Sequence, residues 1–413
     1  MHILFLSDNF PPEVNAPASR TYEHCREWVA AGHSVTVLTC APNFPTGKVF
    51  KGFGNRLWQT EEVSGIRVVR VWTYIAANEG FFFRTLDYLS FMTSAILLAP
   101  LVRKADVVIG TSPQFFTACA AYVASRCRGI PFIFELRDLW PESIRAVGAM
   151  RKSRTLDLLE QLELFLYRRA AKIVSVTRAF KQNLIERGIH HNKISVVTNG
   201  VDLSRFRPRK KDLDLERKLG LKGRFVAGYV GTHGMAHALE TIVEAAHILQ
   251  EKGEGKDFHF LLLGGGARKK YLQELAADLG LKNLTFIDTV SKERVTTYWS
   301  LLDVSIIHLK NVETFRTVIP SKLFECMGMG IPLLHGVKGE SAEIVENKQL
   351  GLLFEPENPD SLCHGLRTLR NDRKIHREFQ RNCLNASKQY DRKQLAQNML
   401  ELIEPFEGNL NSS

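Results

Sequence analysis

Cysteine is scarce in this chain and follows no pattern. Seven cysteines are scattered over 413 residues, without a close pair and without the spacing of a zinc site. This distribution argues against a disulfide framework and against a structural zinc ion. It is typical of small buried thiols in a reducing compartment.

The sequence also lacks an apolar segment long enough to cross a membrane. The uncharged stretch from Tyr88 to Val102 holds about fifteen residues, whereas a spanning helix needs roughly twenty. Because the first residues already have a strand pattern, no signal peptide is expected. The stretch has two interpretations, a buried core helix or an interfacial helix that dips into one leaflet. The middle of the stretch favours the core helix, whereas Phe81-Phe82-Phe83 at its start is harder to bury and favours contact with lipid. Arg84, Arg103 and Lys104 frame the segment.

Acidic residues are too few to balance the basic ones. The formal net charge is +11, and residues 1–200 alone hold 24 Lys and Arg against 16 Asp and Glu, a net charge of +8. A basic first half suits phosphates or an anionic membrane surface. A nucleic-acid partner is disfavoured, because the chain has no basic helix and no aromatic-basic RNA motif.

Apolar runs alternate with helical patterns along the whole chain. A length of 413 residues, with 45% hydrophobic and 24% charged residues, indicates two soluble domains. The alternation predicts an α/β fold with doubly wound parallel sheets. Helices are expected over Arg20–Ala31 and from about Leu239 to Glu251. The expected strands are His2–Leu6, Ser34–Thr39, Ile66–Val71, Asp106–Ile109, Pro131–Leu136, Ile173–Val176 and Ile194–Val197, then Phe225–Val230, Phe258–Leu263, Leu284–Ile287, Val304–His308 and Ile331–Leu334.

A turn and a charged segment separate the two halves. Asn199-Gly200-Val201-Asp202 predicts a turn, and residues 207–212 are charged without periodicity, as in a linker. We expect domains at residues 1–203 and 204–390, and a C-terminal helix within 391–413 that crosses back to the first domain. Ligands of open α/β sheets bind beyond the carboxyl ends of the strands, and a cleft between two domains is a usual site.

The segment from Pro320 to Pro332 combines a cation, a carboxylate and a helix N-terminus. Lys322 and Glu325 are three residues apart, so they share one face of a short helix that is expected to stop at Gly328 and Gly330. Backbone N–H groups, a cation and a carboxylate suit a ligand with phosphates and sugar hydroxyls. The alternative is an ordinary surface helix with one ion pair.

Two glycine-containing turns follow strands of the second half. Gly231 and Gly234 flank Thr232 after one strand, and Gly264 and Gly266 belong to the turn after the next. Glycine lets the backbone approach an anion closely, and a following helix N-terminus adds partial positive charge. Neither turn has the Gly-x-Gly-x-x-Gly spacing, so a nicotinamide enzyme is disfavoured. Tight turns without a ligand are the alternative.

Together these segments resemble the retaining glycosyltransferases of family four. The resemblance covers nearly the whole chain, is strongest from Tyr167 to Phe206, and includes Pro320–Pro332 and Phe354–Pro359. Arg137–Ser143 and Pro11-Pro12-Glu13 are similar to segments of bacterial O-antigen and capsule sugar transferases, including N-acetyl-fucosaminyl transferases. The resemblance implies the GT-B fold, in which two Rossmann-like domains face a central cleft. The first domain then binds the acceptor and the second binds the donor.

The resemblance assigns donor roles to residues of the second half. The family's Glu-x7-Glu motif contacts the donor sugar and the ribose, and Glu325 matches the second Glu. Thr317 stands at the first position, where it can bond a sugar hydroxyl but carries no charge. Ser321 falls where backbone N–H groups meet the donor phosphates. Gly231, Thr232, Gly234, Gly264 and Gly266 belong to the same expected donor site.

The chain departs from the family at its phosphate cations. Many members carry Arg and Lys after the strand that ends at Gly231, and these positions hold Thr232 and His237 here. Loss of two cations weakens stabilisation of a departing nucleotide diphosphate. We expect Lys322 to replace them, with a protonated His237 beside the phosphates.

Acceptor residues are expected at the carboxyl ends of strands in the first half. Asp138 follows the strand that ends at Leu136 and can orient or deprotonate an acceptor hydroxyl, with an N-cap role as the alternative. Arg137 stands where the family often has His. Asn15 and Arg20 flank the first loop, which lacks the family's usual glycines.

The resemblance implies a reaction and its partners. The protein is expected to transfer a sugar, N-acetyl-fucosamine or a related amino sugar, from a UDP-sugar to a polyprenyl-diphosphate-linked acceptor, with retention and without a metal or other cofactor. It would act at the inner face of the cytoplasmic membrane in surface polysaccharide biosynthesis. Two alternatives use the same fold: a UDP-sugar 2-epimerase, which needs no acceptor, and a non-catalytic scaffold.

Overall fold

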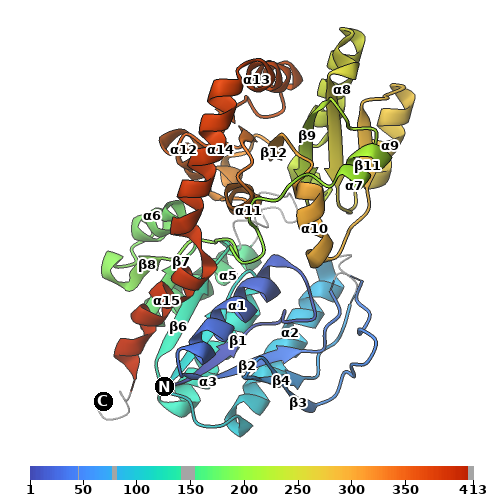
Figure 1. Cartoon of the computed structure of the whole chain (residues 1–413). Helices are drawn as coiled ribbons and strands as arrows, with labels where there is room; N and C mark the ends of the chain where they lie inside the picture. Colours follow the sequence, from blue (N-terminus) through green and yellow to red (C-terminus); the bar gives the residue numbers. More distant parts are fainter. Residues whose placement is uncertain (45, 77–80, 141–153, 408–413) are drawn as a thin grey trace. The chain divides into compact units, whose positions relative to one another are not determined.

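The chain folds into two compact units, each built on its own sheet (Figure 1). The structure is a computed structural model that describes residues 1–44, 46–76, 81–140 and 154–407. Unit 1 comprises residues 1–199 and 392–413, and unit 2 comprises residues 200–391. Both units alternate strands and helices, which confirms the predicted α/β class.

Unit 1 contains an eight-stranded sheet with the order β3-β4-β2-β1-β5-β6-β7-β8. Its strands are β1 (His2–Leu6), β2 (Ser34–Cys40), β3 (Trp58–Val63), β4 (Ile66–Val71), β5 (Val107–Thr111), β6 (Phe132–Leu136), β7 (Lys172–Ser175) and β8 (Ile194–Val196). Neighbouring strands are parallel except β3, which pairs antiparallel with β4 and which the sequence analysis missed. The strand order reverses between β1 and β5, the switch point where such sheets bind ligands.

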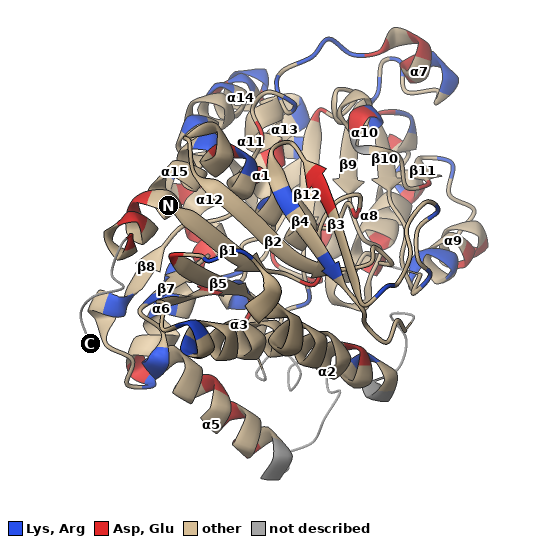
Figure 2. Cartoon of the chain, turned by 90° about the horizontal axis from the view of Figure 1, so that it is seen from below, with Lys and Arg blue, Asp and Glu red and all other residues tan. Residues whose placement is uncertain are grey.

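Helices cover both faces of the unit 1 sheet (Figures 1 and 2). They are α1 (Ala16–Ala30), α2 (Phe81–Leu98), α3 (Phe115–Arg128), α5 (Arg154–Arg169), α6 (Arg178–Glu186) and α15 (Arg392–Ile403). Alternate residues of β1 face opposite cores. Leu4 packs in the core formed with α2, α3, α5 and α6, whereas Phe5 packs with Trp28 of α1 and with α15.

The helices α1 and α15 are joined by polar contacts inside unit 1. The indole N–H of Trp28 donates to the Ala396 carbonyl at 2.8 Å, and Arg392 pairs with Glu23. The helix α1 begins four residues before the predicted Arg20, because the Asn15 side chain caps it by accepting the Ala18 N–H at 2.9 Å. The last helix therefore belongs to the unit that contains the first strand.

Unit 2 contains a six-stranded parallel sheet with the order β11-β10-β9-β12-β13-β14. Its strands are β9 (Phe225–Val230), β10 (Phe258–Leu263), β11 (Leu284–Ile287), β12 (Val304–His308), β13 (Leu333–Gly336) and β14 (Gly351–Leu353). Its helices are α7 (Leu213–Lys218), α8 (Glu240–Glu251), α9 (Lys269–Asp278), α10 (Lys292–Trp299), α11 (Lys322–Met329), α12 (Glu340–Asn347), α13 (Pro359–Asn371) and α14 (Arg373–Ser387). The predicted strand at Ile331 begins two residues later, after Pro332, which has no N–H to donate.

The helix α11 passes through Gly328, contrary to the sequence prediction. A Cβ at Gly328 would lie 2.7 Å from the Phe206 carbonyl oxygen, so glycine is needed for packing at that point. The helix ends at Gly330, whose φ of 68° is left-handed. Glycine therefore serves two different purposes within three residues.

Candidate functional site

Lys322 lies beside the turn that follows β9. Its Nζ donates to the Tyr229 hydroxyl at 3.3 Å and lies 4.8 Å from the centre of the Tyr229 ring. A Cβ at Gly231 would collide with the side chain of Lys322, so glycine gives this ammonium access to the turn. Burial lowers the pKa of Lys322, while the nearby Glu325 carboxylate opposes that shift. The structure thus brings the expected cation to the carboxyl end of β9.

The turns after β9 and β10 pack backbone against backbone. The His233 N–H donates to the Gly265 carbonyl at 2.8 Å, and both Gly264 and Gly266 have a φ of 147°. A Cβ at Gly266 would lie 2.6 Å from the His233 carbonyl oxygen, and one at Gly264 would collide with the Gly231 carbonyl. These glycines are therefore required by the packing of the two turns, whether or not a ligand binds.

The histidine that stands at the position of a family cation has a lowered pKa. His237 follows Gly234 within a short 3-10 helix (Met235–His237), and its ring lies 5.9 Å from that of Tyr229. Burial, together with the positive charge of Lys322, lowers the pKa of His237 to about 4. This pKa favours the neutral ring, whereas protonation of His237 beside bound phosphates stays a prediction. A neutral imidazole offers one hydrogen-bond donor and one acceptor instead.

Three further residues of this region escaped the sequence analysis. Tyr229 lies in β9 and has the sequence pattern of a core residue. Its hydroxyl donates to the carbonyl of the exposed Thr232 at 2.8 Å. His233 is fully buried, and neither ring nitrogen has a hydrogen-bond partner among the described residues. Lys269 donates to the Gly264 carbonyl at 2.8 Å and so supports the β10 turn. A lysine shortly after a glycine turn was the available signal for Lys269.

The remaining donor candidates lie on α11 and just before it. Ser321 occupies the N-cap position of α11 without a capping bond from its side chain. Glu325 is half-buried one turn beyond Lys322 on the same face. Thr317 ends a 3-10 helix (Glu313–Thr317) and donates its hydroxyl to the Thr314 carbonyl at 2.8 Å. Their contacts with a donor stay predictions.

In unit 1, Arg20 is enclosed by protein groups. It is 4% exposed, and its Nε pairs with Glu135 of β6 at 2.8 Å. Its remaining nitrogens donate to the carbonyls of Val197 at 3.1 Å and Thr198 at 2.8 Å. The expected acceptor contact is therefore corrected: Arg20 ties α1 to β6 and to the end of β8. Asn15 is likewise occupied as the cap of α1.

Arg137 and Asp138 follow β6 and are held by Ser112, the residue after the neighbouring strand β5. Both backbone N–H groups donate to the Ser112 hydroxyl, at 2.7 Å and 3.2 Å. Both side chains are half-buried, and burial lowers the pKa of Arg137 to about 10 although Glu135 opposes the shift. Residues 141–153 lie outside the described part of the chain, so the alternative of an N-cap role for Asp138 stays open.

A second carboxylate lies at the switch point of the sheet. Asp8 follows β1 and is half-buried, and its Oδ2 accepts a hydrogen bond from Gln114, which follows β5, at 3.0 Å. Burial and the nearby carboxylates of Glu13 and Asp87 raise the pKa of Asp8 to about 7. Sequence analysis missed this residue, because only the contacts between distant segments produce the shift. A carboxyl group that titrates near neutral pH is suited to accept a proton.

The uncharged stretch after Tyr88 has one buried side and one exposed side. Phe91 and Ala95 of α2 are fully buried, whereas Leu97 is 69% exposed and Leu101, in the following 3-10 helix, is 67% exposed. Phe83 is 52% exposed, and the side chains of Phe81 and Phe82 lie outside the described residues. Within the described residues, no helix combines the length and apolarity needed to cross a bilayer. The core-helix interpretation therefore accounts for one face of α2 only.

The chain matches two family models that together cover most of its length. The model described as Glycosyl transferase 4-like domain matches residues 15–200, and Glycosyl transferases group 1 matches residues 212–389. A colanic acid biosynthesis glycosyl transferase, as WcaI of Escherichia coli K12 is named, is 24% identical over 379 residues, covering 89% of this chain and 91% of its own. The UDP-Gal:alpha-D-GlcNAc-diphosphoundecaprenol alpha-1,3-galactosyltransferase of Escherichia coli is 26% identical over 309 residues, with coverages of 73% and 76%.

Solved structures share the fold over nearly the whole chain. Sucrose-phosphate synthase from Thermosynechococcus elongatus has a TM-score of 0.76 at 15% identity and covers 98% of both chains. Anabaena HepE, in complex with UDP and glucose, has a TM-score of 0.73 at 16% identity, covering 98% of this chain and all of its own. The family models and the solved structures thus agree on both expected Rossmann-like domains. The chain belongs to the group 1 glycosyltransferases with the GT-B fold.

Proposed function

We propose that the protein transfers a sugar, N-acetyl-fucosamine or a related amino sugar, from a UDP-sugar to a polyprenyl-diphosphate-linked acceptor. The reaction retains the anomeric configuration and serves surface polysaccharide biosynthesis at the inner face of the cytoplasmic membrane. The observation that carries the donor half is the placement of Lys322 at the glycine turn after β9, one helical turn from Glu325. The diphosphoundecaprenol acceptor named for one relative supports the acceptor half.

On the donor side, the chemistry needs stabilisation of a departing diphosphate. Lys322 supplies a positive charge, and the N-terminus of α11 at Ser321 supplies the partial positive charge of a helix start. The neutral imidazole of His237 adds a hydrogen-bond donor in place of a family cation. Glu325 accepts hydrogen bonds from the ribose hydroxyls, and Thr317 contacts the donor sugar. No step of this scheme requires a metal.

On the acceptor side, a carboxylate orients the attacking hydroxyl. Asp138 is the candidate from the sequence, and Asp8 is a second candidate because of its position at the switch point and its raised pKa. The hydroxyl oxygen bonds to the anomeric carbon on the face that the UDP leaves. The hydroxyl proton passes to the departing phosphate or to the carboxylate, and UDP carries away the electrons of the broken C–O bond.

The partner surface is a membrane that carries the lipid-linked acceptor. The exposed leucines of α2 and the basic surplus of residues 1–200 support contact with an anionic leaflet. Such contact would bring the enzyme to a substrate that cannot leave the bilayer. The protein is therefore placed, as a proposal, among peripheral membrane enzymes.

The test begins with the purified full chain and a panel of UDP-sugars in a thermal-shift assay. The true donor is expected to raise Tm most, because only the folded protein binds it. Transfer to polyprenyl-diphosphate-linked GlcNAc is then followed by chromatography of the radiolabelled lipid. Isomerised UDP-sugar in reactions without acceptor would identify an epimerase. Absence of both UDP binding and transfer would identify a scaffold, and either result would overturn the proposal.

A further inference from the structure

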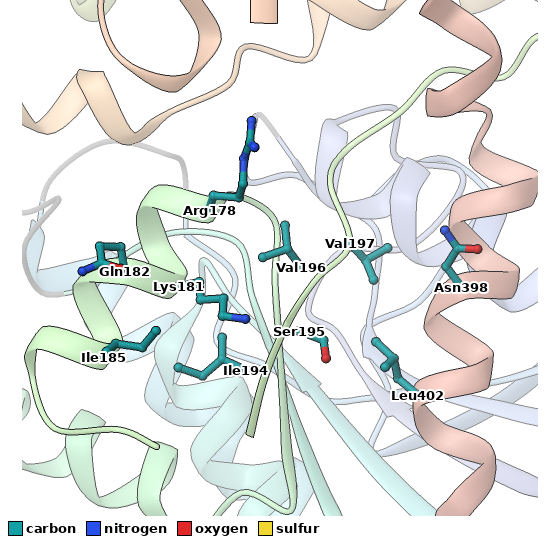
Figure 3. Close-up of a pocket in the computed structure, with 10 residues that line it drawn as sticks. All are labelled: Arg178, Lys181, Gln182, Ile185, Ile194, Ser195, Val196, Val197, Asn398 and Leu402. Carbon is teal, nitrogen blue, oxygen red and sulfur yellow. The ribbon is translucent and has the colours of Figure 1, made fainter. Parts of the chain in front are cut away.

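A cavity of about 650 Å³ opens along β8, the last strand of the unit 1 sheet. Figure 3 shows α6 on one side of this strand and α15 on the other, with side chains from all three elements lining the space. All lining residues belong to unit 1. None of them is among the residues assigned above to the donor or the acceptor. The proposed donor and acceptor sites therefore do not account for the cavity.

The cavity follows the open edge of the sheet. Four consecutive residues, Ile194 to Val197, line it. Side chains alternate between the two faces of a strand, so a space lined by four consecutive residues must run along the edge. On α6, the lining residues Arg178, Lys181 and Ile185 are three and four positions apart and form one stripe. The space is thus a groove parallel to the strand, about 13 Å long at 3.3 Å per strand residue.

The edge presents backbone hydrogen-bonding groups to this groove. The Val197 N–H donates to the Ser175 carbonyl of β7 at 2.9 Å, so Val197 directs this group inward. Successive residues of a strand direct their backbone groups to opposite sides. Val196 therefore directs its N–H and C=O away from β7, and β8 has no further neighbour among the strands that the structure describes. Such an edge accepts another strand unless it is covered.

The walls of the groove favour one kind of strand. Lys181 provides a positive charge on the α6 wall, and the described acidic residues include none that lines the cavity. Figure 3 shows the Lys181 side chain extending towards Ser195 of β8. Ile185 of α6 and Leu402 of α15 are half-buried and add apolar surface on the two opposite walls. A carboxylate on the incoming strand would meet Lys181, and its apolar side chains would meet Ile185 and Leu402.

We propose that this groove binds an extended acidic segment of a partner protein, which adds to β8 as a further strand. Main-chain hydrogen bonds with Val196 supply affinity, and Lys181 selects acidic side chains. The proposal does not depend on the donor or the acceptor. It gives this enzyme a docking site for a protein partner in addition to its catalytic residues.

The test uses the full chain and a fluorescein-labelled eight-residue peptide in which valine alternates with glutamate. We expect saturable binding in an anisotropy titration. A peptide with lysine in place of glutamate should bind at least tenfold more weakly, and so should a glutamate peptide with N-methylated alternate amides. Equal binding of the N-methylated peptide, or no binding of any peptide, would overturn the proposal. Full displacement by millimolar inorganic phosphate would reveal a simple anion site and would overturn it too.

Variants locate the binding on β8. Val196→Pro removes an N–H that β7 does not use, so we expect the fold to survive and the peptide to be lost. Val196→Thr keeps the N–H and should bind like the parent. Lys181→Glu should bind at least tenfold more weakly, whereas Lys51→Glu, an exposed change elsewhere in unit 1, should have no effect.

Amide hydrogen exchange provides a readout that does not depend on a substitution. In 15N-valine-labelled protein, the peptide should slow exchange at Val196 at least tenfold and leave Val197, already bonded to Ser175, unchanged. Unchanged exchange at Val196 in the peptide-saturated protein would contradict strand addition. A dimer that dissociates in Val196→Pro, together with no peptide binding, would assign the groove to a second copy and also overturn the proposal.

Discussion

Lys322 offers the sharpest test at the scale of single residues. Replacement by Met keeps most of its volume but removes the charge beside the β9 turn. We expect kcat to fall by about 10²–10³, as for loss of a group that stabilises a developing negative charge. UDP affinity, measured by calorimetry, should fall as well.

Two further variants separate charge from packing at this position. Lys322→Arg should retain part of the activity, because it keeps the charge with a different shape. Lys282→Met removes an exposed lysine elsewhere in unit 2 and should leave both constants unchanged. If Lys322→Met binds UDP and turns over like the parent, the phosphate role is rejected.

Asp8 predicts a pH dependence of transfer. Its pKa is raised to about 7 by burial and by Glu13 and Asp87, and we expect the ionised form to serve the acceptor. The ratio kcat/KM should therefore rise with pH through about 7 and then level off. Asp87→Asn removes one like charge and should move this rise to lower pH, by roughly half a unit to one unit.

The same residue predicts opposite effects on stability and on activity. Because the pKa of Asp8 is higher in the folded protein than its value of 3.8 in an unfolded chain, the free energy of unfolding decreases as pH rises from about 4 to about 7. Asp8→Asn should thus stabilise the protein above pH 7, on the order of 1 kcal/mol, while it lowers transfer. The exposed Asp157→Asn is the matched control.

An unshifted pH profile of kcat/KM in Asp87→Asn would reject the electrostatic coupling between Asp87 and Asp8.

At the scale of elements, Arg20 connects α1 to β6 and to the end of β8. Arg20→Met leaves the buried Glu135 carboxylate without its partner and leaves two carbonyls without a donor. We expect a loss of about 3–5 kcal/mol in the free energy of unfolding, measured by urea denaturation. Arg26→Met, on the exposed side of the same helix, should cost at most about 0.5 kcal/mol.

A double variant tests whether the loss of stability in Arg20→Met comes from the Glu135 charge that is left without its ion-pair partner. Arg20→Met with Glu135→Gln removes both charges, so it should be more stable than Arg20→Met alone. If the two single changes were simply additive, Arg20 would act through packing and not through the ion pair. UDP affinity should be unchanged in all folded variants, because these residues lie in unit 1.

The elements also show how far local patterns reach. The sequence located most strands of both sheets, since buried parallel strands are continuous apolar runs. It missed β3, which is a half-exposed edge strand, and β14, which has three residues. Helix α11 was expected with Lys322 and Glu325 on one face, yet its passage through Gly328 depended on the backbone of Phe206.

At the scale of the whole molecule, membrane attachment is the main prediction. Leu97 and Leu101 lie exposed on one side of the α2 region. Leu97→Glu with Leu101→Glu should lower partitioning onto phosphatidylethanolamine–phosphatidylglycerol vesicles about tenfold or more, because two apolar side chains no longer enter the leaflet. Sedimentation with vesicles measures the effect.

Two controls in the vesicle experiment separate the effect of the leucine positions from the effect of the basic surface charge. Leu213→Glu changes a leucine of unit 2 that is 64% exposed and should leave vesicle binding as it is. Raising the salt concentration from 0.1 M to 0.5 M should weaken binding of the parent, because the basic surface attracts the anionic lipid. Equal partitioning of all variants would contradict insertion of α2.

The sequence by itself determined the two α/β domains, the family and the helix that carries Lys322 and Glu325, because these depend on local periodicity and on short motifs. Only the tertiary structure decided the state of individual side chains. Arg20 is buried in an ion pair with Glu135, the pKa of His237 is lowered to about 4, and the pKa of Asp8 is raised to about 7. Each of these outcomes depends on burial and on charges from distant segments, and folding alone brings them together.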